Sequence, residues 1–183
     1  MKVHPSVKIL QSQGLGSRKI CEEIFWESEI IRNGVPFNPE VDQFDWGDVL
    51  IIDGQPPLHI QKNVYLLLNK PAGYETSHKP MQHPSVFNLL PKRYLERGVQ
   101  AAGRLDQDTT GALILSDDGQ FIHQLISGKR GKKQSIEKIY DIECARTVSQ
   151  QMVDSLLAGV ELHDEPELIS ASQVHLMGDH NLR

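Results

Sequence analysis

The sequence predicts an α+β fold in which a small N-terminal unit precedes a larger mixed domain. Segments with helical spacing and segments with strand character alternate loosely along the 183 residues. No glycine-rich loop of the GxGxxG or GxxxxGKS/T type follows a predicted strand, and this absence disfavours a doubly wound nucleotide-binding sheet. A proline-containing break at residues 55–57 separates the two parts.

The N-terminal unit is predicted to begin with helices. Ser17 is a favourable N-cap, and apolar residues follow it at helical spacing, so a helix is expected over residues 18–26. An earlier apolar stretch predicts one or two helical turns that end at Gly14 or Gly16.

Strands are predicted for the remainder of this unit. Asn33-Gly34 between apolar segments is a strong hairpin signal, and residues 49–52 form a further strand that ends at a turn. We therefore expect this unit to span residues 1–56 and a linker to span residues 57–63.

The remaining chain, residues 64–183, is predicted to be one mixed domain. The continuous apolar run at its start is typical of a buried strand. Apolar spacing and turn residues predict strands at 64–69, 112–115 and 139–144, and helices at 120–126 and 149–158.

The composition is that of a globular protein. Apolar residues make up 39% of the chain and charged residues 23%, which excludes wholesale disorder. The apolar runs are far shorter than the roughly 20 residues of a membrane span, and no signal sequence is visible. We expect a cytoplasmic protein with no membrane partner. Cys21 and Cys144 lie in separate segments and are expected to be reduced, buried thiols.

Positive charge is concentrated in two short stretches, although the net charge is −5. Residues 1–20 carry four basic residues and no acid, and residues 128–138 carry five basic residues against one Glu. Such clustering is expected if a phosphate backbone touches only part of the surface. Ordinary solvated patches remain the alternative.

The densest polar segment is residues 103–111, which read GRLDQDTTG and precede a predicted strand. In an extended segment, Arg104 and Asp106 point to the same face. A guanidinium near a carboxylate lowers the pKa of the carboxylate and keeps it available as a nucleophile. The alternative is that Arg104, Asp106 and Asp108 only satisfy backbone groups in a turn.

Another interpretation of these acidic residues is metal binding. Asp106 and Asp108, together with Asp117 and Asp118, also fit a divalent-cation site in a metal-dependent transferase. Pairs of this kind are common in turns, and the eight His residues are scattered without paired spacing. We expect neither a metal nor an organic cofactor.

A basic, glycine-containing stretch, GKRGKKQSIEKIY, occupies residues 128–140. A loop of this composition suits contact with a sugar-phosphate backbone, and Tyr140 offers a ring on which a base can stack. Tyr140 equally fits an ordinary strand aromatic at the edge of a core.

Three motifs together resemble the RNA pseudouridine synthases. They are LNKPAGY at residues 68–74, the segment from Gly103 through Asp117-Asp118-Gly119, and EKIY at residues 137–140. The variants DTTG at 108–111 and GVELH at 159–163 are most similar to the branch that modifies one uridine of small-subunit ribosomal RNA. Residues 1–55 resemble the alpha-L RNA-binding module.

The resemblance implies a role for each matching residue. Asp106 would be the nucleophile during cleavage of the uridine glycosidic bond, Tyr140 would stack on the target base, and Arg104 would flip and hold the nucleotide. A mixed, largely antiparallel catalytic sheet is implied, without cofactor. The expected partner is small-subunit ribosomal RNA or a partly assembled subunit, bound by a monomer. The RNA-contacting cations would be Arg18, Lys19, Lys70, Lys129, Arg130, Lys132, Lys133 and Lys138.

One departure from the family bears on activity. The family has a further C-terminal motif that supplies a basic partner to the catalytic carboxylate, whereas this sequence stops at Arg183. The resemblance therefore implies a catalytic domain that is incomplete at its C-terminus, with an exposed sheet edge. The alternative function is an RNA-binding protein without catalytic activity.

Overall fold

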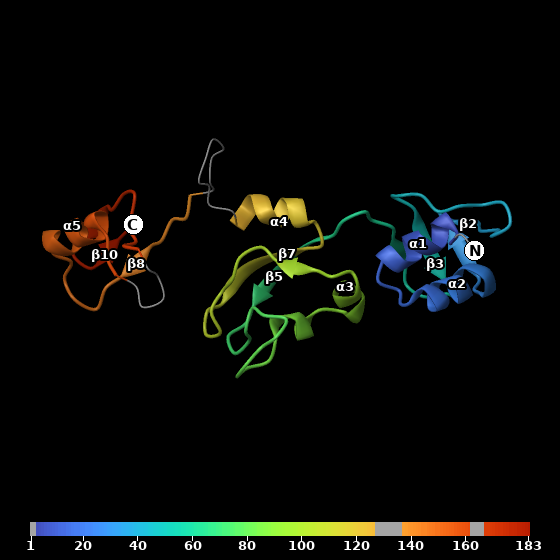
Figure 1. Cartoon of the computed structure of the whole chain (residues 1–183), viewed down its shortest axis with the longest axis horizontal. Coiled ribbons are helices and arrows are strands. Elements are labelled where there is room, and N and C mark those ends of the chain that lie inside the picture. The colour runs from blue at the N-terminus through green and yellow to red at the C-terminus, as the bar shows by residue number, and fades with distance from the viewer. Residues whose placement is uncertain (1–2, 127–136, 162–166) are drawn as a thin grey trace. The chain divides into compact units, whose positions relative to one another are not determined.

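The computed structural model describes residues 3–126, 137–161 and 167–183 (Figure 1). Two compact units divide the chain, Met1–Ser135 and Ile136–Arg183. Helices and antiparallel sheets occur in both units, as expected for the predicted α+β class.

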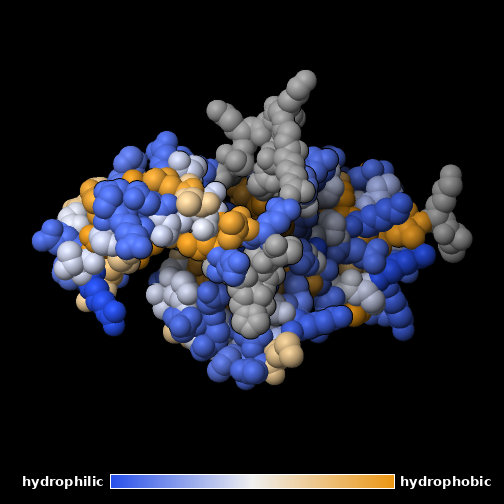
Figure 2. All heavy atoms as spheres, turned by 60° about the vertical axis from the view of Figure 1, so that its left-hand side comes forward, coloured by the Kyte–Doolittle hydropathy of each residue, from blue (hydrophilic) through white to orange (hydrophobic). Residues whose placement is uncertain are grey.

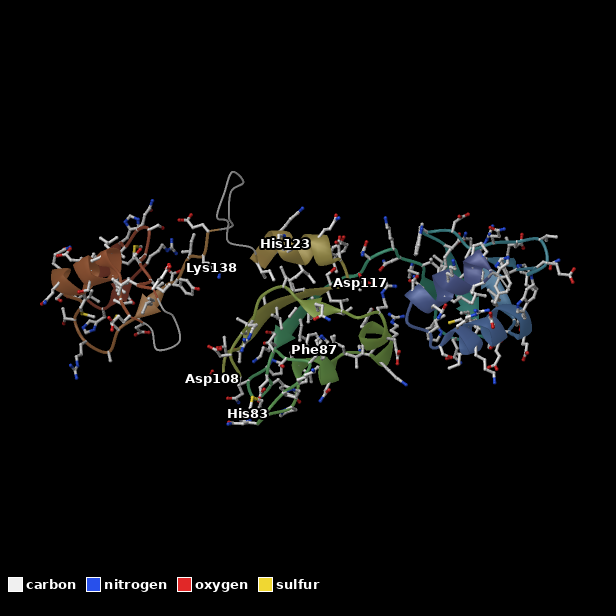
Figure 3. The ribbon with its side chains drawn as sticks, in the orientation of Figure 1. His83, Phe87, Asp108, Asp117, His123 and Lys138 are labelled. Carbon is white, nitrogen blue, oxygen red and sulfur yellow. The ribbon has the colours of Figure 1, made fainter. Side chains whose placement is uncertain are left out.

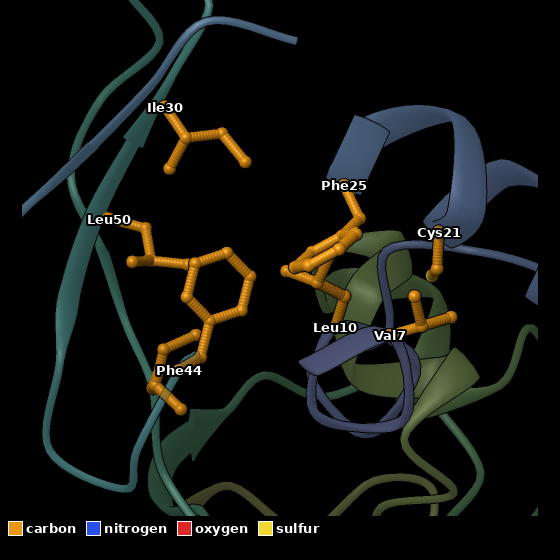
Figure 4. Close-up of a cluster of buried hydrophobic side chains, with 8 residues drawn as sticks. Val7, Leu10, Cys21, Phe25, Ile30, Phe44 and Leu50 are labelled. Carbon is orange, nitrogen blue, oxygen red and sulfur yellow. The ribbon is translucent and has the colours of Figure 1, made fainter. Parts of the chain in front are cut away.

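The first unit begins with two helices that bury one face each. In α1 (Pro5–Ser12), proline occupies the first turn, where its missing N–H costs no hydrogen bond. In α2 (Arg18–Glu27), the Ser17 hydroxyl accepts a hydrogen bond from the Ile20 amide, so the predicted N-cap is confirmed. Figure 4 shows the apolar side chains of both helices (Val7, Leu10, Cys21 and Phe25) facing Ile30 and Leu50 of the adjoining strands and Phe44 of the loop before the third strand.

A four-stranded antiparallel sheet, in the order β2-β1-β3-β4, completes this core. The hairpin predicted at Asn33-Gly34 joins β1 to β2, with both turn residues at positive φ, 52° and 82°. Both angles are those of a type I′ turn, whose twist matches the flanking strands. The strands are β1 (Ile30–Arg32), β2 (Val35–Pro36), β3 (Val49–Ile52) and β4 (Leu58–His59).

The linker is shorter than the predicted residues 57–63, because part of that segment belongs to the N-terminal sheet. Leu50 of β3 pairs with Leu58 of β4, and Ile60 is 1% exposed within the N-terminal core. Residues 60–64 lie between this sheet and the next strand, and Ile60 still belongs to the N-terminal core. The prolines at 56 and 57 precede an edge strand, a position that tolerates them because one side of the strand needs no ladder hydrogen bonds.

A second antiparallel sheet, in the order β5-β7-β6, follows (Figure 1). One face covers a core that includes Val86, Phe87 and Val99. Burial alternates along β5, so its other face is largely exposed: Leu67 is 73% exposed, while Tyr65 on the same face contacts the Phe121 ring. The prediction of a fully buried strand is therefore wrong. The elements are β5 (Tyr65–Lys70), η1 (Val86–Leu89), α3 (Lys92–Glu96), β6 (Gln100–Ala101), β7 (Gly111–Ser116) and α4 (Gly119–Ile126).

A buried guanidinium connects four segments of the first unit. The Arg97 side chain is 2% exposed, and its Nε lies 2.8 Å from Oδ2 of Asp117. Arg97 also donates to Oε1 of Gln13 at 2.8 Å and to the Gln61 carbonyl at 3.1 Å. The guanidinium, which follows α3, thereby links the residue after α1, the segment before β5 and the residue after β7.

The second unit combines a helix with a small antiparallel sheet in the order β8-β10-β9. The predicted helix is confirmed: Ser149 caps it and Gly159, at φ 109°, ends it. The strand predicted at 139–144 is reduced to two residues, because only that part pairs with β10. The elements are β8 (Ile142–Glu143), α5 (Gln150–Ala158), β9 (Leu176–Gly178) and β10 (Asn181–Leu182).

Apolar and polar side chains mingle on the surface (Figure 2). No helix among the described residues has both the length and the apolar character that a bilayer span requires. The two cysteines are free; Cys21 is buried, and burial raises the pKa of its thiol, whereas Cys144 is only partly buried.

Candidate active site

The loop between β6 and β7 presents alternate side chains to solvent. Arg104, Asp106 and Asp108 are exposed, whereas Leu105 and Gln107 between them are half-buried. This is the alternation predicted for an extended segment. Asp108 marks the loop in Figure 3.

The charged side chains of Arg104 and Asp106 do not supply the hydrogen bonds that close the turn. Among the residues that the structure describes, neither Arg104 nor Asp106 makes a side-chain hydrogen bond or ion pair. The turn is instead closed by backbone, since the Thr109 amide donates to the Asp106 carbonyl at 3.1 Å. Arg104 and Asp106 form no ion pair with each other, although they lie on the same side of the loop, and both side chains are exposed.

The loop backbone is held by the NKPAG segment. The Gly73 amide donates to the Gln107 carbonyl at 2.8 Å, and Nζ of Lys70 donates to the carbonyls of Gln107 and Thr109 at 3.2 and 2.7 Å. Gly73 has φ 91°, a conformation that a residue with a Cβ rarely adopts. Two motifs that lie more than thirty residues apart in sequence therefore form one structural element.

Lys70 does not occupy the position expected for an RNA contact. Its side chain is fully buried, at 0% exposure, and its third hydrogen bond goes to the Pro71 carbonyl at 3.1 Å. A buried ammonium whose donors are engaged by three carbonyls cannot reach a phosphate. The prediction for Lys70 is therefore corrected: this cation stabilises the loop that carries Asp106.

Thr76 is a site residue that sequence reasoning missed. Its Oγ1 donates to the Leu105 carbonyl at 2.7 Å and lies 3.3 Å from the Leu105 amide, which donates to it. The hydroxyl therefore contacts the peptide groups on both sides of Leu105, between Arg104 and Asp106. No signal in the sequence marks this threonine, because the contact spans 29 residues.

The other acids of the cation-site interpretation have separate roles. Asp117 accepts from Arg97, and Asp118 accepts from the amides of Gln120 and Phe121 at the start of α4. The Phe121 amide, followed by the Tyr65 hydroxyl, lowers the pKa of Asp118. Within the described part of the chain, no three His, Cys, Asp or Glu side chains are grouped to hold a metal.

The predicted RNA-contacting cations fall into three sets. Arg18 and Lys19 are exposed at the start of α2 and pair with Glu22 and Glu23 at 2.8 and 3.8 Å. Lys138 is also exposed, in the second unit (Figure 3). Four of the predicted contacts lie outside the described residues: Lys129, Arg130, Lys132 and Lys133.

Tyr140 lies in the second unit, just before β8. Its side chain is 65% exposed, so it is not the core aromatic of the alternative interpretation. Its neighbour Asp141 forms an ion pair with Arg183, with Nε and Oδ1 2.7 Å apart. An exposed tyrosine ring has a face free for stacking.

Comparison with known proteins agrees with the motifs. The model of the RNA pseudouridylate synthase family matches residues 64–174, more than half of the chain. The chain belongs to this family. The enzyme class predicted from the three motifs, an RNA pseudouridine synthase, is thereby confirmed at the level of the family.

Two relatives are named ribosomal small subunit pseudouridine synthase A. The protein from Yersinia pestis is 29% identical over 174 residues, which is 94% of this chain and 69% of the relative. The protein from Escherichia coli strain K12 is 32% identical over 159 residues, 86% of this chain and 64% of the relative. The chain thus spans about two thirds of the length of these relatives.

A solved structure has a similar fold. The crystal structure of a pseudouridylate synthase matches 97% of this chain and 74% of its own, with a TM-score of 0.51 and 24% identity. The expected mixed fold with antiparallel sheets is therefore confirmed.

Proposed function

We propose that this protein converts a uridine of small-subunit ribosomal RNA to pseudouridine, with Asp106 as the nucleophile. The observation that carries the proposal is the exposed Asp106 carboxylate. It lies on a loop whose backbone is hydrogen-bonded to Lys70 and Gly73 of the LNKPAGY motif. The substrate class comes from the two relatives, whose names specify the small ribosomal subunit.

The reaction exchanges one glycosidic bond for another. The bond between C1′ of the ribose and N1 of uracil breaks, and a bond between C1′ and C5 forms. The C5 proton passes to solvent, and N1 takes up a proton. An ionised carboxylate suits the nucleophilic step because it forms a covalent intermediate without prior loss of a proton.

Other predicted site residues are proposed to supply binding. Arg104 lies on the same exposed side of the loop as Asp106 and offers a guanidinium to a phosphate or a flipped nucleotide. Tyr140 offers a stacking surface for the base. Arg18, Lys19 and Lys138 supply exposed positive charge for the RNA backbone. The protein acts as a monomer, which gel filtration tests.

Tritium release from small-subunit RNA labelled at C5 of uridine tests the proposal, because formation of the C–C bond liberates that hydrogen. We expect the unsubstituted chain to release tritium and Asp106→Asn to release none, while RNA affinity stays within a factor of two. Asp108→Asn, which changes an exposed acid two residues away, is the matched control.

Each contrary outcome identifies what is wrong. Tritium release by Asp106→Asn would exclude the nucleophile assignment. RNA binding without release by the unsubstituted chain would favour the alternative function, an RNA-binding protein without catalytic activity. Loss of activity on addition of a chelator would favour the metal-dependent alternative.

A further inference from the structure

The hydroxyl of Thr76 holds the catalytic loop from both sides of one residue. It donates to the Leu105 carbonyl at 2.7 Å and accepts from the Leu105 amide at 3.3 Å. These two groups belong to the peptide bonds that connect Leu105 to Arg104 and to Asp106. The Leu105 side chain packs against the core that includes Phe87, so the residue is also anchored by its apolar group.

The segment that carries Thr76 is itself anchored on one side by a closed loop. The Glu75 carboxylate accepts hydrogen bonds from three successive amides, those of Met81, Gln82 and His83, at 2.9, 2.8 and 2.7 Å. The Glu75 backbone bonds to the Pro84 carbonyl and the Val86 amide, each at 2.9 Å. The loop that follows Thr76 therefore folds back onto Glu75, the residue before Thr76.

A second anchor lies on the other side of Thr76. The His78 ring stacks on the Phe87 ring, with centroids 3.6 Å apart and planes 10° apart. Its Nε2 lies 3.1 Å from the Val99 carbonyl. Because both flanks of Thr76 are fixed to the core, the position of its hydroxyl is determined before any RNA binds.

We propose that Thr76 is a positioning residue for Asp106: it sets the direction of the Asp106 carboxylate by bracketing the two peptide groups that flank Leu105. This inference rests on the proposed function and adds a residue to it. Thr76 lies in the segment after the NKPAG motif and is half-buried, so it acts through Leu105. Removing the hydroxyl leaves the loop held by its Gly73 and Lys70 contacts, while the two peptide groups that flank Leu105 lose their hydrogen bonds to Thr76.

Four variants of the full chain test this role in single-turnover tritium release from C5-labelled small-subunit RNA. Thr76→Val keeps the side-chain shape and removes both hydrogen bonds, Thr76→Ser keeps them, and Thr76→Cys offers weak ones. Ser77→Ala is the matched control, because among the described residues the Ser77 hydroxyl accepts a hydrogen bond from the Lys79 amide of its own loop and makes no side-chain bond to the loop that carries Asp106.

We expect Thr76→Val to slow the chemical step roughly 10- to 100-fold, the effect of misplacing a catalytic group by about 1 Å. Its affinity for RNA is expected to stay within a factor of two. The expected order of rates is threonine and serine, then cysteine, then valine, with Ser77→Ala unchanged. If Thr76→Val fails to fold, the difference between Thr76→Cys and Thr76→Ser carries the same test.

The outcomes separate this inference from the proposed function. If the unsubstituted chain releases tritium and Thr76→Val releases it equally fast, only the positioning role is overturned. Equal rates for the cysteine and serine variants, or a loss confined to RNA affinity, would also overturn it. If the unsubstituted chain releases no tritium, the proposed function and this inference both fail.

Discussion

Lys70 shows how a charged residue acts within this protein without touching solvent. Its ammonium donates to the carbonyls of Pro71, Gln107 and Thr109, and the side chain is fully buried. The Gln107 carbonyl also accepts a hydrogen bond from the Gly73 amide, so it keeps one partner if the lysine is removed. The other two carbonyls have no replacement donor among the contacts described for the loop.

Substitution of Lys70 should therefore affect stability. We expect Lys70→Met to lower the free energy of unfolding by about 1–3 kcal/mol, the cost of leaving buried acceptors unpaired. Urea unfolding followed by circular dichroism measures it. Lys62→Met, at an exposed lysine of the same unit, is the control and should change stability by less than about 0.5 kcal/mol. Equal effects of the two substitutions would contradict the structural role.

Glu75 makes the loop that follows it sensitive to acid. The amides of Gln82, Met81 and His83 hold the pKa of its carboxyl below the usual range. A carboxyl whose folded pKa is lowered contributes stability above its unfolded pKa, about 4.3, and loses that contribution as pH falls through the folded value.

We therefore expect Glu75→Gln to be less stable than the unsubstituted protein at pH 7, with the difference shrinking below about pH 4.3. Thermal unfolding midpoints of both proteins between pH 7 and pH 3 measure this difference. Glu40→Gln, at an exposed acid of the first unit, is the control. A constant difference across this range would show that Glu75 acts by shape and not by charge.

At the scale of secondary-structure elements, Arg97 is the junction of the first unit. Its guanidinium reaches Asp117 after β7, Gln13 after α1 and the carbonyls of residues 61 and 62. A single substitution there removes several hydrogen bonds and leaves the Asp117 carboxylate, 10% exposed, without its counter-charge.

We expect Arg97→Met to cost about 3–5 kcal/mol of unfolding free energy, the usual effect of breaking a buried ion pair. Arg93→Met is the matched control, because Arg93 lies one helical turn earlier and is exposed, and the side-chain interactions described for it are with Tyr94. The control is expected to change stability by less than about 1 kcal/mol. Chemical denaturation measures the unfolding free energy of both variants. A similar small loss of stability in both would contradict the proposed role of Arg97.

At the scale of the whole molecule, the proposed RNA binding would depend on local rather than net charge. The chain carries a net charge of −5, yet its N-terminal 20 residues have four basic residues and no acid. Arg18 and Lys19 already pair with glutamates on their own helix. Exposed pairs of this kind contribute only about 0.3–0.5 kcal/mol, so phosphates can compete for these cations.

We expect the Arg18→Ala, Lys19→Ala double variant to bind RNA more weakly and to reduce the slope of log affinity against log salt by roughly 1.4, about 0.7 for each phosphate contact. Filter binding across a range of salt concentrations measures this slope. Lys92→Ala is the control, because Lys92 is as exposed as Lys19 and pairs with Glu96 in the same i,i+4 geometry. An unchanged slope in the double variant would exclude these two contacts.

Local signals in the sequence predicted the helices α2, α4 and α5, the β1–β2 hairpin and the strands β3 and β7, but not the short elements η1, α3, β6, β9 and β10. The Ser17 and Ser149 caps, the Asn33-Gly34 turn and the end of α5 at Gly159 follow from backbone chemistry that acts within a few residues. The errors concern packing. The open face of β5 and the pairing of β4 with β3 depend on which distant segment lies opposite.

The sequence by itself determined the family and the acid that is its candidate nucleophile, because three ordered motifs carry residue types that the chemistry requires. Only the tertiary structure decided what each residue near that acid does. It buried Lys70 beneath the loop, left Arg104 and Asp106 exposed and placed the Thr76 hydroxyl between them. The physical reason is that hydrogen bonds and burial depend on contacts between segments about 30 to 40 residues apart, which local spacing does not encode.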